Sequence, residues 1–137
     1  MENKLKVFLS HSLKDCEFAQ NLTDYLIYEN IEVLCAEHIS EYNDTISNKI
    51  KKLIKFSDIG IVFLTEDGFK SNFVQQEIGY MEDKIEYVPI VDIRYKGKMT
   101  GFYYAKDFIT FDIKKPDEVN DKLMKYLIKQ KKILNKK

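Results

Sequence analysis

Glu77 is the residue of this 137-residue chain whose position most strongly suggests chemistry. Ser71 is a good helix N-cap, and the apolar side chains of Val74, Ile78 and Met81 recur at the spacing of one buried helical face. Glu77 falls beside that face. Spacing alone, however, describes a solvated surface carboxylate, which is the commoner case.

Two neighbouring features favour a functional role for Glu77. The apolar run 59–64 upstream is typical of a buried strand, and in an open α/β sheet ligands gather beyond the carboxyl ends of the strands. Phe73 stands four residues before Glu77, so on a helix the two side chains lie one above the other. Because other apolar residues already fill the buried face, we expect Phe73 to form a pocket wall rather than part of the core.

The rest of the chain alternates between short apolar runs and helical patterns. Strands are predicted at 5–9, 31–35, 59–64, 87–91 and 108–111. Apolar residues at helical spacing predict helices after Ser12, over 46–54, over 71–81 and after Pro116. Loops are predicted at 36–44, which is long enough for a binding loop, and at 65–70. Pro89 cannot donate to a ladder, which argues for an end, a bulge or edge-like pairing there.

This order of elements predicts an α/β fold with a parallel sheet, helices on both faces and right-handed crossovers. The length fits one domain, which we place at 1–137 with its core at about 4–128. The lysine-rich end, 129–137, is expected to be a solvated tail or helix end whose cations complement the helix dipole.

The composition indicates which binding partners and which cellular compartment are expected for this chain. The chain has 22 Lys and Arg against 22 Asp and Glu, so no overall field favours nucleic acid or an anionic membrane surface. Cys16 and Cys35 form no CxxC motif and no disulfide framework, which favours a reducing compartment. The apolar runs are far shorter than a membrane span needs. We therefore expect a cytoplasmic protein that contacts neither nucleic acid nor membrane.

With its residues laid out in this way, the chain resembles the TIR (Toll/interleukin-1 receptor) domain family in its microbial form. The resemblance is carried by the first strand and loop (7–15), by the strand 58–64 and by the helix start 71–77. It extends from Lys4 to about Ile128. The order and spacing of these segments, rather than any one of them, make the resemblance specific.

The resemblance implies a flavodoxin-like three-layer fold with a five-stranded parallel sheet, and in many microbial members an enzyme that cleaves NAD between ribose and nicotinamide. The family's catalytic glutamate corresponds to Glu77, and its Trp-x-x-x-Glu pattern reads Phe73-x-x-x-Glu77 here, without the indole N–H donor. In this family the loop after the second strand often closes over the substrate, so the resemblance implies substrate contacts for Tyr42 and Asp44. This loop commonly carries Gly-Asp in the family, and the corresponding residues here are Asn43-Asp44. The resemblance also implies TIR–TIR self-association, and a nucleotide signal for a separate effector in anti-phage defence.

NAD cleavage is chemically compatible with one carboxylate. Nicotinamide is a pyridinium that departs neutral, so no general acid is needed, and Glu77 alone is sufficient to stabilise the ribosyl cation. NAD is then the substrate, and no cofactor is expected. No GxGxxG is present, so the donors for the phosphates are expected in the backbone and side chains of Ser10, His11, Ser12, Leu13 and Lys14.

Two of these residues have simpler interpretations. Ser12 and Asp15 resemble a capping box, so Ser12 is either an N-cap or a ligand contact. His11 has no partner at metal-ligand spacing, and no metal site is predicted.

Three other functions remain open. Some TIR domains act only by assembling with other TIR domains, without catalysis. A receiver domain is disfavoured, because it would need an acidic pair after the first strand, where Ser10, His11 and Ser12 stand instead. A nucleoside deoxyribosyltransferase also uses a glutamate at an anomeric carbon. Within the NAD-cleaving hypothesis, the product is either ADP-ribose or a cyclic isomer.

Overall fold

A five-stranded parallel sheet forms the centre of the protein, with strand order β2-β1-β3-β4-β5. The computed structural model describes residues 4–35, 48–94, 108–112, 114–115 and 117–135. The strands in that part of the chain are β1 (Lys6–Ser10), β2 (Glu32–Cys35), β3 (Ile59–Leu64), β4 (Glu86–Asp92) and β5 (Ile109–Phe111). All five predicted strands are present, and their bounds differ from the prediction by at most one residue at either end.

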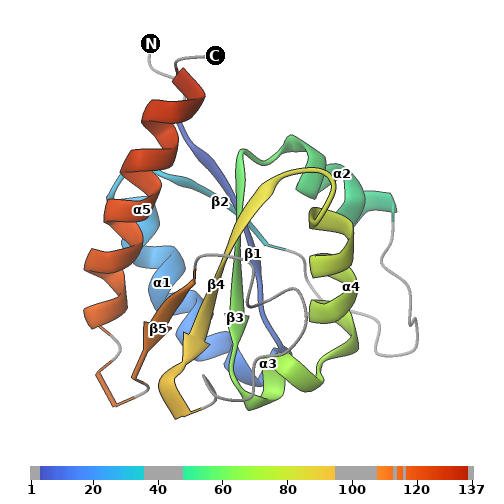
Figure 1. The fold of residues 1–137 in the computed structure, drawn as a ribbon, viewed down its shortest axis with the longest axis vertical. Coiled ribbons are helices and arrows are strands. Elements are labelled where there is room, and N and C mark those ends of the chain that lie inside the picture. The colour runs from blue at the N-terminus through green and yellow to red at the C-terminus, as the bar shows by residue number, and fades with distance from the viewer. Residues whose placement is uncertain (1–3, 36–47, 95–107, 113, 116, 136–137) are drawn as a thin grey trace.

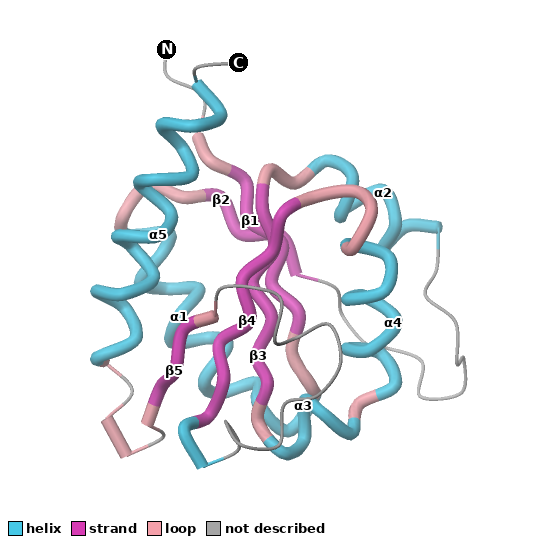
Figure 2. Tube along the Cα trace, viewed as in Figure 1, coloured by secondary structure: helices cyan, strands magenta, loops and turns pink. Residues whose placement is uncertain are grey.

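Helices cover both faces of this sheet, as predicted for an α/β fold (Figures 1 and 2). They are α1 (Cys16–Tyr28), preceded by the 3-10 helix η1 (Leu13–Asp15), α2 (Asn48–Phe56), α3 (Glu66–Lys70), α4 (Asn72–Met81) and α5 (Glu118–Asn135). One hydrophobic cluster packs α1 and α5 against the sheet, and a second packs α2 and α4 against the other face. The chain therefore has the three-layer, flavodoxin-like arrangement expected from the sequence.

The central strand β3 is buried along its whole length and fixes the position of α4. Gly60 leaves room for the close approach of α4, because a Cβ at this position would collide with the sulfur of Met81. Val74 and Ile78 of the same helix are also fully buried. This tight packing holds α4 against the sheet with its first residues near the carboxyl ends of β1 and β3.

Pro89 lies in the interior of β4, and the pairing explains why it is tolerated there. On one side Pro89 is in register with Val62 of β3, whereas the pairing of β4 with β5 begins only at Ile90 among the described residues. A residue without an N–H is compatible with a strand that has one neighbour at that point. The edge-like alternative that the sequence left open is the one observed.

One prediction about an individual segment was wrong. Residues 66–70 form the short helix α3 rather than a loop, because the Thr65 side chain caps it by accepting a hydrogen bond from the Gly68 N–H at 3.1 Å. The lysine-rich end is helical as far as Asn135, where α5 ends, so of the two alternatives given for it the helix end is the one observed. None of the helices within the described ranges is both long and apolar enough to cross a membrane.

Candidate active site

The strongest candidate for chemistry is a buried hydrogen bond between β1 and α4. Ser10, the last residue of β1, donates through Oγ to Oε1 of Glu77 at 2.6 Å. Both residues have no solvent-exposed surface. A serine hydroxyl and a carboxyl group are thus held together at the carboxyl end of the first strand, which is where parallel α/β folds place their ligands.

The position of Glu77 on α4 explains why it is buried. Val74, Glu77, Ile78 and Met81 are the four buried residues of this helix, and they recur at i, i+3, i+4 and i+7. Glu77 therefore occupies a regular position of the core-facing stripe, and the solvated interpretation was wrong. The helix itself begins as predicted, since Ser71 Oγ accepts a hydrogen bond from the Val74 N–H at 3.2 Å.

Burial controls the protonation of this carboxyl group. Loss of solvation raises the pKa of Glu77 to about 8, although the hydrogen bond from Ser10 lowers it. The carboxyl group is therefore mostly protonated at pH 7 in the free protein. A carboxyl group with a pKa near neutrality at the end of a central strand is characteristic of catalytic acids and bases.

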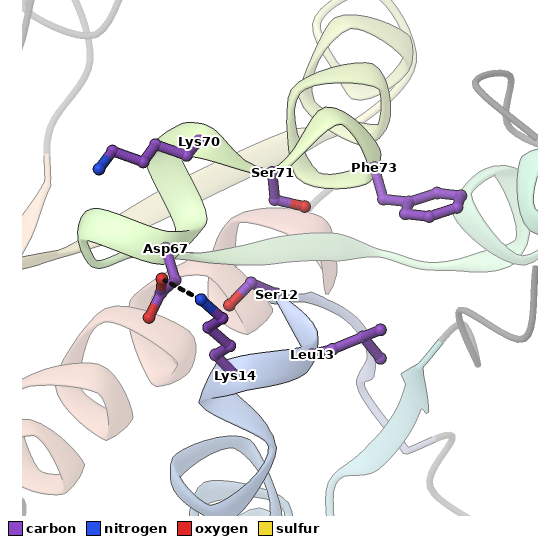
Figure 3. A pocket seen from close by; sticks show the side chains of 7 residues that line it. All are labelled: Ser12, Leu13, Lys14, Asp67, Lys70, Ser71 and Phe73. Carbon is purple, nitrogen blue, oxygen red and sulfur yellow. Dashed lines mark ion pairs between the residues drawn. The ribbon is translucent and has the colours of Figure 1, made fainter. Parts of the chain in front are cut away.

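A pocket of about 290 Å³ is lined in part by residues close in sequence to Ser10 and Glu77. It is formed where the segment after β1 meets α3 and the start of α4, and Figure 3 shows its lining residues: Ser12, Leu13, Lys14, Asp67, Lys70, Ser71 and Phe73. Ser10 precedes Ser12 by two residues, and Phe73 precedes Glu77 by about one helical turn. The two segments that supply the buried pair thus also supply the pocket.

The walls of this pocket differ in chemical character. Leu13, with 45% of its surface exposed, and the half-buried Phe73 provide apolar surface. On another side the Lys14 ammonium lies 3.7 Å from an Asp67 carboxylate oxygen, and Lys70 points away from Phe73 (Figure 3). The pocket therefore offers a flat apolar surface for a ring, and a lysine for an anionic group.

Asp15 connects the two segments that form the pocket. Its Oδ2 accepts hydrogen bonds from Ser12 Oγ at 2.9 Å and from Thr65 Oγ1 at 2.6 Å. Ser12 therefore does not act as the predicted capping residue, and its side chain makes no cap hydrogen bond to η1. Instead, the carboxylate of Asp15 joins the end of β3 to the segment that follows β1.

His11 follows Ser10 in the chain, and its side chain contacts the end of β2. Its side chain is 7% exposed, with Nδ1 at 2.8 Å from the Ser12 carbonyl oxygen and Nε2 at 3.2 Å from the Cys35 sulfur. It does not line the pocket next to Phe73.

The structure brings some of the predicted site residues together and separates others. Ser10 and Glu77 form one pair, whereas Ser12, Leu13, Lys14 and Phe73 meet in the pocket. The predicted contacts of Tyr42 and Asp44 lie outside the described residues.

Sequence reasoning did not identify Asp67 and Lys70 as candidates. Both follow β3, and the rule that ligands gather beyond the carboxyl ends of neighbouring strands could have indicated them, because β1 and β3 are adjacent in the sheet. Nothing in the pattern of 65–70 distinguishes these two residues, because the segment is predicted to be a connecting loop.

Comparison with solved structures places the fold among TIR domains and related α/β proteins. The TIR domains of the activated Roq1 resistosome, which directly recognises the pathogen effector XopQ, match with a TM-score of 0.58 and 21% identity over 74% of this chain and 68% of theirs. The CMP N-glycosidase BcmB from Clostridium botulinum matches with a TM-score of 0.59 and 18% identity over 86% of this chain and 97% of that enzyme. A diflavin flavoprotein A3 from Nostoc gives a TM-score of 0.50 and 7% identity over 80% of each chain.

Sequence comparison identifies the family directly. No curated protein matches the chain. The family model for the TIR domain matches residues 7–127, which include most of β1, Glu77 and the first part of α5. This chain belongs to the TIR domain family.

Proposed function

We propose that this protein cleaves the N-glycosidic bond of a ribonucleotide, and that its substrate is NAD, cut between ribose and nicotinamide. The observation that carries the proposal is the buried Ser10–Glu77 pair, which holds a carboxyl group of raised pKa at the carboxyl end of β1, while residues from the same two segments line a pocket. The products would be nicotinamide and either ADP-ribose or a cyclic isomer, according to whether water or the substrate itself captures the ribosyl cation.

In this reaction Glu77 acts in its ionised form. The bond to nicotinamide breaks heterolytically, the electron pair leaves with the pyridinium nitrogen, and positive charge develops on the ribose. The carboxylate stabilises that charge at close range, where the surrounding low dielectric strengthens the interaction. The positive nicotinamide ring of the bound substrate also favours ionisation of Glu77, opposing the effect of burial. Ser10 orients the carboxylate through its hydrogen bond.

The neighbouring pocket supplies complementary binding surface. Phe73 and Leu13 present an apolar wall that suits a flat heterocyclic ring, and the Lys14 ammonium suits a phosphate oxygen. Because Glu77 has no exposed surface, the reaction includes a step in which substrate displaces a group that covers the carboxyl. Entry of substrate and opening of the site are therefore coupled.

A second candidate is hydrolysis of a nucleoside monophosphate such as CMP, and the protonated state of Glu77 favours it. A neutral nucleobase leaves poorly unless it is protonated, and a carboxyl group that keeps its proton at pH 7 is a suitable general acid. The similarity in fold to the CMP N-glycosidase BcmB adds support. The two reactions require opposite protonation states of the same residue, which makes them separable.

Self-association is the third element of the proposal, supported by the TIR fold shared with the Roq1 resistosome. If a neighbouring subunit completes the site, the specific activity rises with protein concentration, as mass action on the oligomer requires. If assembly is the whole function, light scattering detects association while nucleotides stay intact. We further propose that a nucleotide product acts as a signal for a separate effector in anti-phage defence, by analogy with the microbial TIR domains that the sequence resembles.

The decisive experiment is chromatography of NAD and of CMP after incubation with the purified protein at high concentration, with Glu77→Gln as the matched variant. Loss of NAD with release of nicotinamide in the parent, but not in the variant, supports the first candidate. Loss of CMP alone supports the second. If both nucleotides stay intact while the protein assembles, the glycosidase proposal is wrong and the assembly function remains.

A further inference from the structure

We propose that Cys35 and His11 form a nucleophile–base pair, and that Cys35 is a site of covalent modification by low-molecular-weight disulfides. The two residues come from different elements. Cys35 is the last residue of β2, and His11 follows the end of β1. In the parallel register Leu9 pairs with Cys35, so the side chain of His11, two residues further on, reaches back over the end of the edge strand.

The hydrogen bonds of His11 fix which of its nitrogens is basic. Nδ1 lies 2.8 Å from the carbonyl oxygen of Ser12, and a carbonyl oxygen only accepts, so Nδ1 carries a proton and donates. In the neutral ring the lone pair is then on Nε2. That nitrogen lies 3.2 Å from the sulfur of Cys35. The thiol therefore faces the basic nitrogen of an imidazole whose orientation is held by a third group, which is the arrangement of an activated nucleophile.

The solvent exposure of His11 and of Cys35 differs in the way that an activated cysteine requires. His11 is 7% exposed, so its ring is held in place by its surroundings. Cys35 is exposed to solvent, which gives a small electrophile access to the sulfur. A reactive cysteine is characterised by a neighbouring base together with an accessible sulfur, whereas a cysteine enclosed in the core is inert.

The chemical step is thiol–disulfide exchange. The proton of the Cys35 thiol passes to His11 Nε2, and the thiolate attacks one sulfur of the incoming disulfide. A new disulfide bond forms between Cys35 and that sulfur, while the bond between the two sulfurs of the reagent breaks. The leaving thiolate takes the proton from the imidazolium and departs as a thiol. Cys35 is oxidised and the leaving sulfur is reduced, so no further reactant is needed.

Cys16 provides an internal control for this reactivity. It is also exposed, and it stands at the first position of α1. Within the described residues its side chain has no hydrogen bond to a base. Only Cys35 should therefore depend on His11.

The probe is oxidised glutathione, with the mixed disulfide at each cysteine quantified by mass spectrometry. Proteolysis after glutamate separates the two cysteines, since Glu17, Glu29 and Glu32 lie between them, whereas no lysine or arginine lies between Lys14 and Lys49. The variant is His11→Asn, because an asparagine amide keeps a donor for the Ser12 carbonyl but removes the base. Cys35→Ser confirms the assignment of the modified peptide.

At pH 6.5 we expect the modification of Cys35 in the folded parent to be at least about tenfold faster than in His11→Asn, with the rate at Cys16 unchanged within about threefold. The two Cys35 rates should converge near pH 9, where a cysteine ionises without help. Equal Cys35 rates in parent and variant at pH 6.5 would overturn the proposal.

A second measurement covers the case in which His11→Asn does not fold. In the parent, unfolding by urea should slow Cys35 at pH 6.5 by about tenfold, because the thiol loses its base. If Cys35 reacts at the same rate in the folded and the unfolded parent, the pairing with His11 does not activate it and the proposal is wrong.

Discussion

The Oγ of Ser10 and the Oε1 of Glu77 lie 2.6 Å apart, although the two residues are separated by 67 positions in the chain. The contact arises because β1 is next to β3 in the sheet, and α4, which follows β3, packs back over that part of the sheet. The only polar side chain on the buried stripe of α4 thereby meets the hydroxyl at the end of β1.

Replacement of Glu77 by glutamine should lower turnover of the nucleotide substrate by at least about 100-fold, because glutamine neither stabilises a cation as a carboxylate does nor donates a proton as an acid. Circular dichroism should show the fold unchanged, since glutamine has nearly the same shape. The matched control is Glu86→Gln, an exposed glutamate at the amino end of β4. Its turnover should stay within about threefold of the parent, and a similar value for Glu77→Gln would end the catalytic assignment.

The pH dependence of kcat/KM should separate the two candidate substrates. Cleavage of NAD uses ionised Glu77, so its kcat/KM should rise with pH and level off above about 8, the pKa of this residue in the free protein. Hydrolysis of CMP uses protonated Glu77, so its kcat/KM should be level below about 8 and fall above it. A profile without inflection near this pH, for whichever substrate is cleaved, would contradict the assigned role.

The stability of the folded protein should also report on Glu77. Its pKa is raised from 4.5 in the unfolded chain to about 8 in the folded protein. The folded state therefore binds the extra proton, and the stabilisation that this provides is complete below pH 4.5 and is lost as the pH rises through about 8. The free energy of unfolding in urea should fall by at most about 1.4 kcal/mol per pH unit across this window.

Glu77→Gln serves as the reference for that measurement. It lacks the titrating group but keeps an acceptor for Ser10, so its stability should vary less with pH over the same range. The difference in free energy of unfolding between variant and parent should therefore grow from pH 5 to pH 8 in favour of the variant. A constant difference would mean that Glu77 titrates alike in both states.

Asp15→Ala should destabilise the protein by about 2 kcal/mol, because Ser12 and Thr65 both lose a charged acceptor. The same variant should weaken substrate binding, since the pocket depends on the position of the segment after β1. Asp24→Ala is the control: within the part of the chain that the structure describes, Asp24 accepts only an exposed hydrogen bond from Gln20 on the surface of α1, and its loss should cost under about 0.5 kcal/mol. Urea unfolding measures the loss of stability in both variants. Equal losses in Asp15→Ala and Asp24→Ala would show that the Asp15 contacts contribute little.

Phe73→Ala tests whether this side chain is a pocket wall. A fully buried phenylalanine costs about 3–5 kcal/mol when truncated to alanine, whereas the half-buried Phe73 should cost clearly less. Substrate KM should rise, or the ratio of linear to cyclic product should change, because a missing wall admits water. Ile78→Ala, from the fully buried stripe of the same helix, should cost about 2–5 kcal/mol. A large stability loss for Phe73→Ala, with unchanged kinetics in the folded fraction, would refute the pocket-wall role.

Local sequence patterns were sufficient to predict most of the elements. The continuous apolar run of β3 and the N-cap at Ser71 depend only on residues close together in the chain, and both were predicted at the positions where the structure has them. The helix α3 was missed because it is only five residues long, and its signal is the single pair of Thr65 and Gly68. A pattern that short falls below the length at which helical periodicity becomes visible.

Local patterns in the sequence are therefore enough to predict the fold class, the order of strands and helices apart from α3, and the segment that carries Glu77. The burial of Glu77 against Ser10, the position of Asp67 and Lys70 in the same pocket as Phe73, and the contact of His11 with Cys35 depend on tertiary packing. The reason is that the polarity of a side chain indicates where it would be most stable alone, while its actual surroundings depend on which strands are neighbours. The burial of a carboxyl group goes against that local preference, and it persists because the remaining contacts of α4 hold the helix in place.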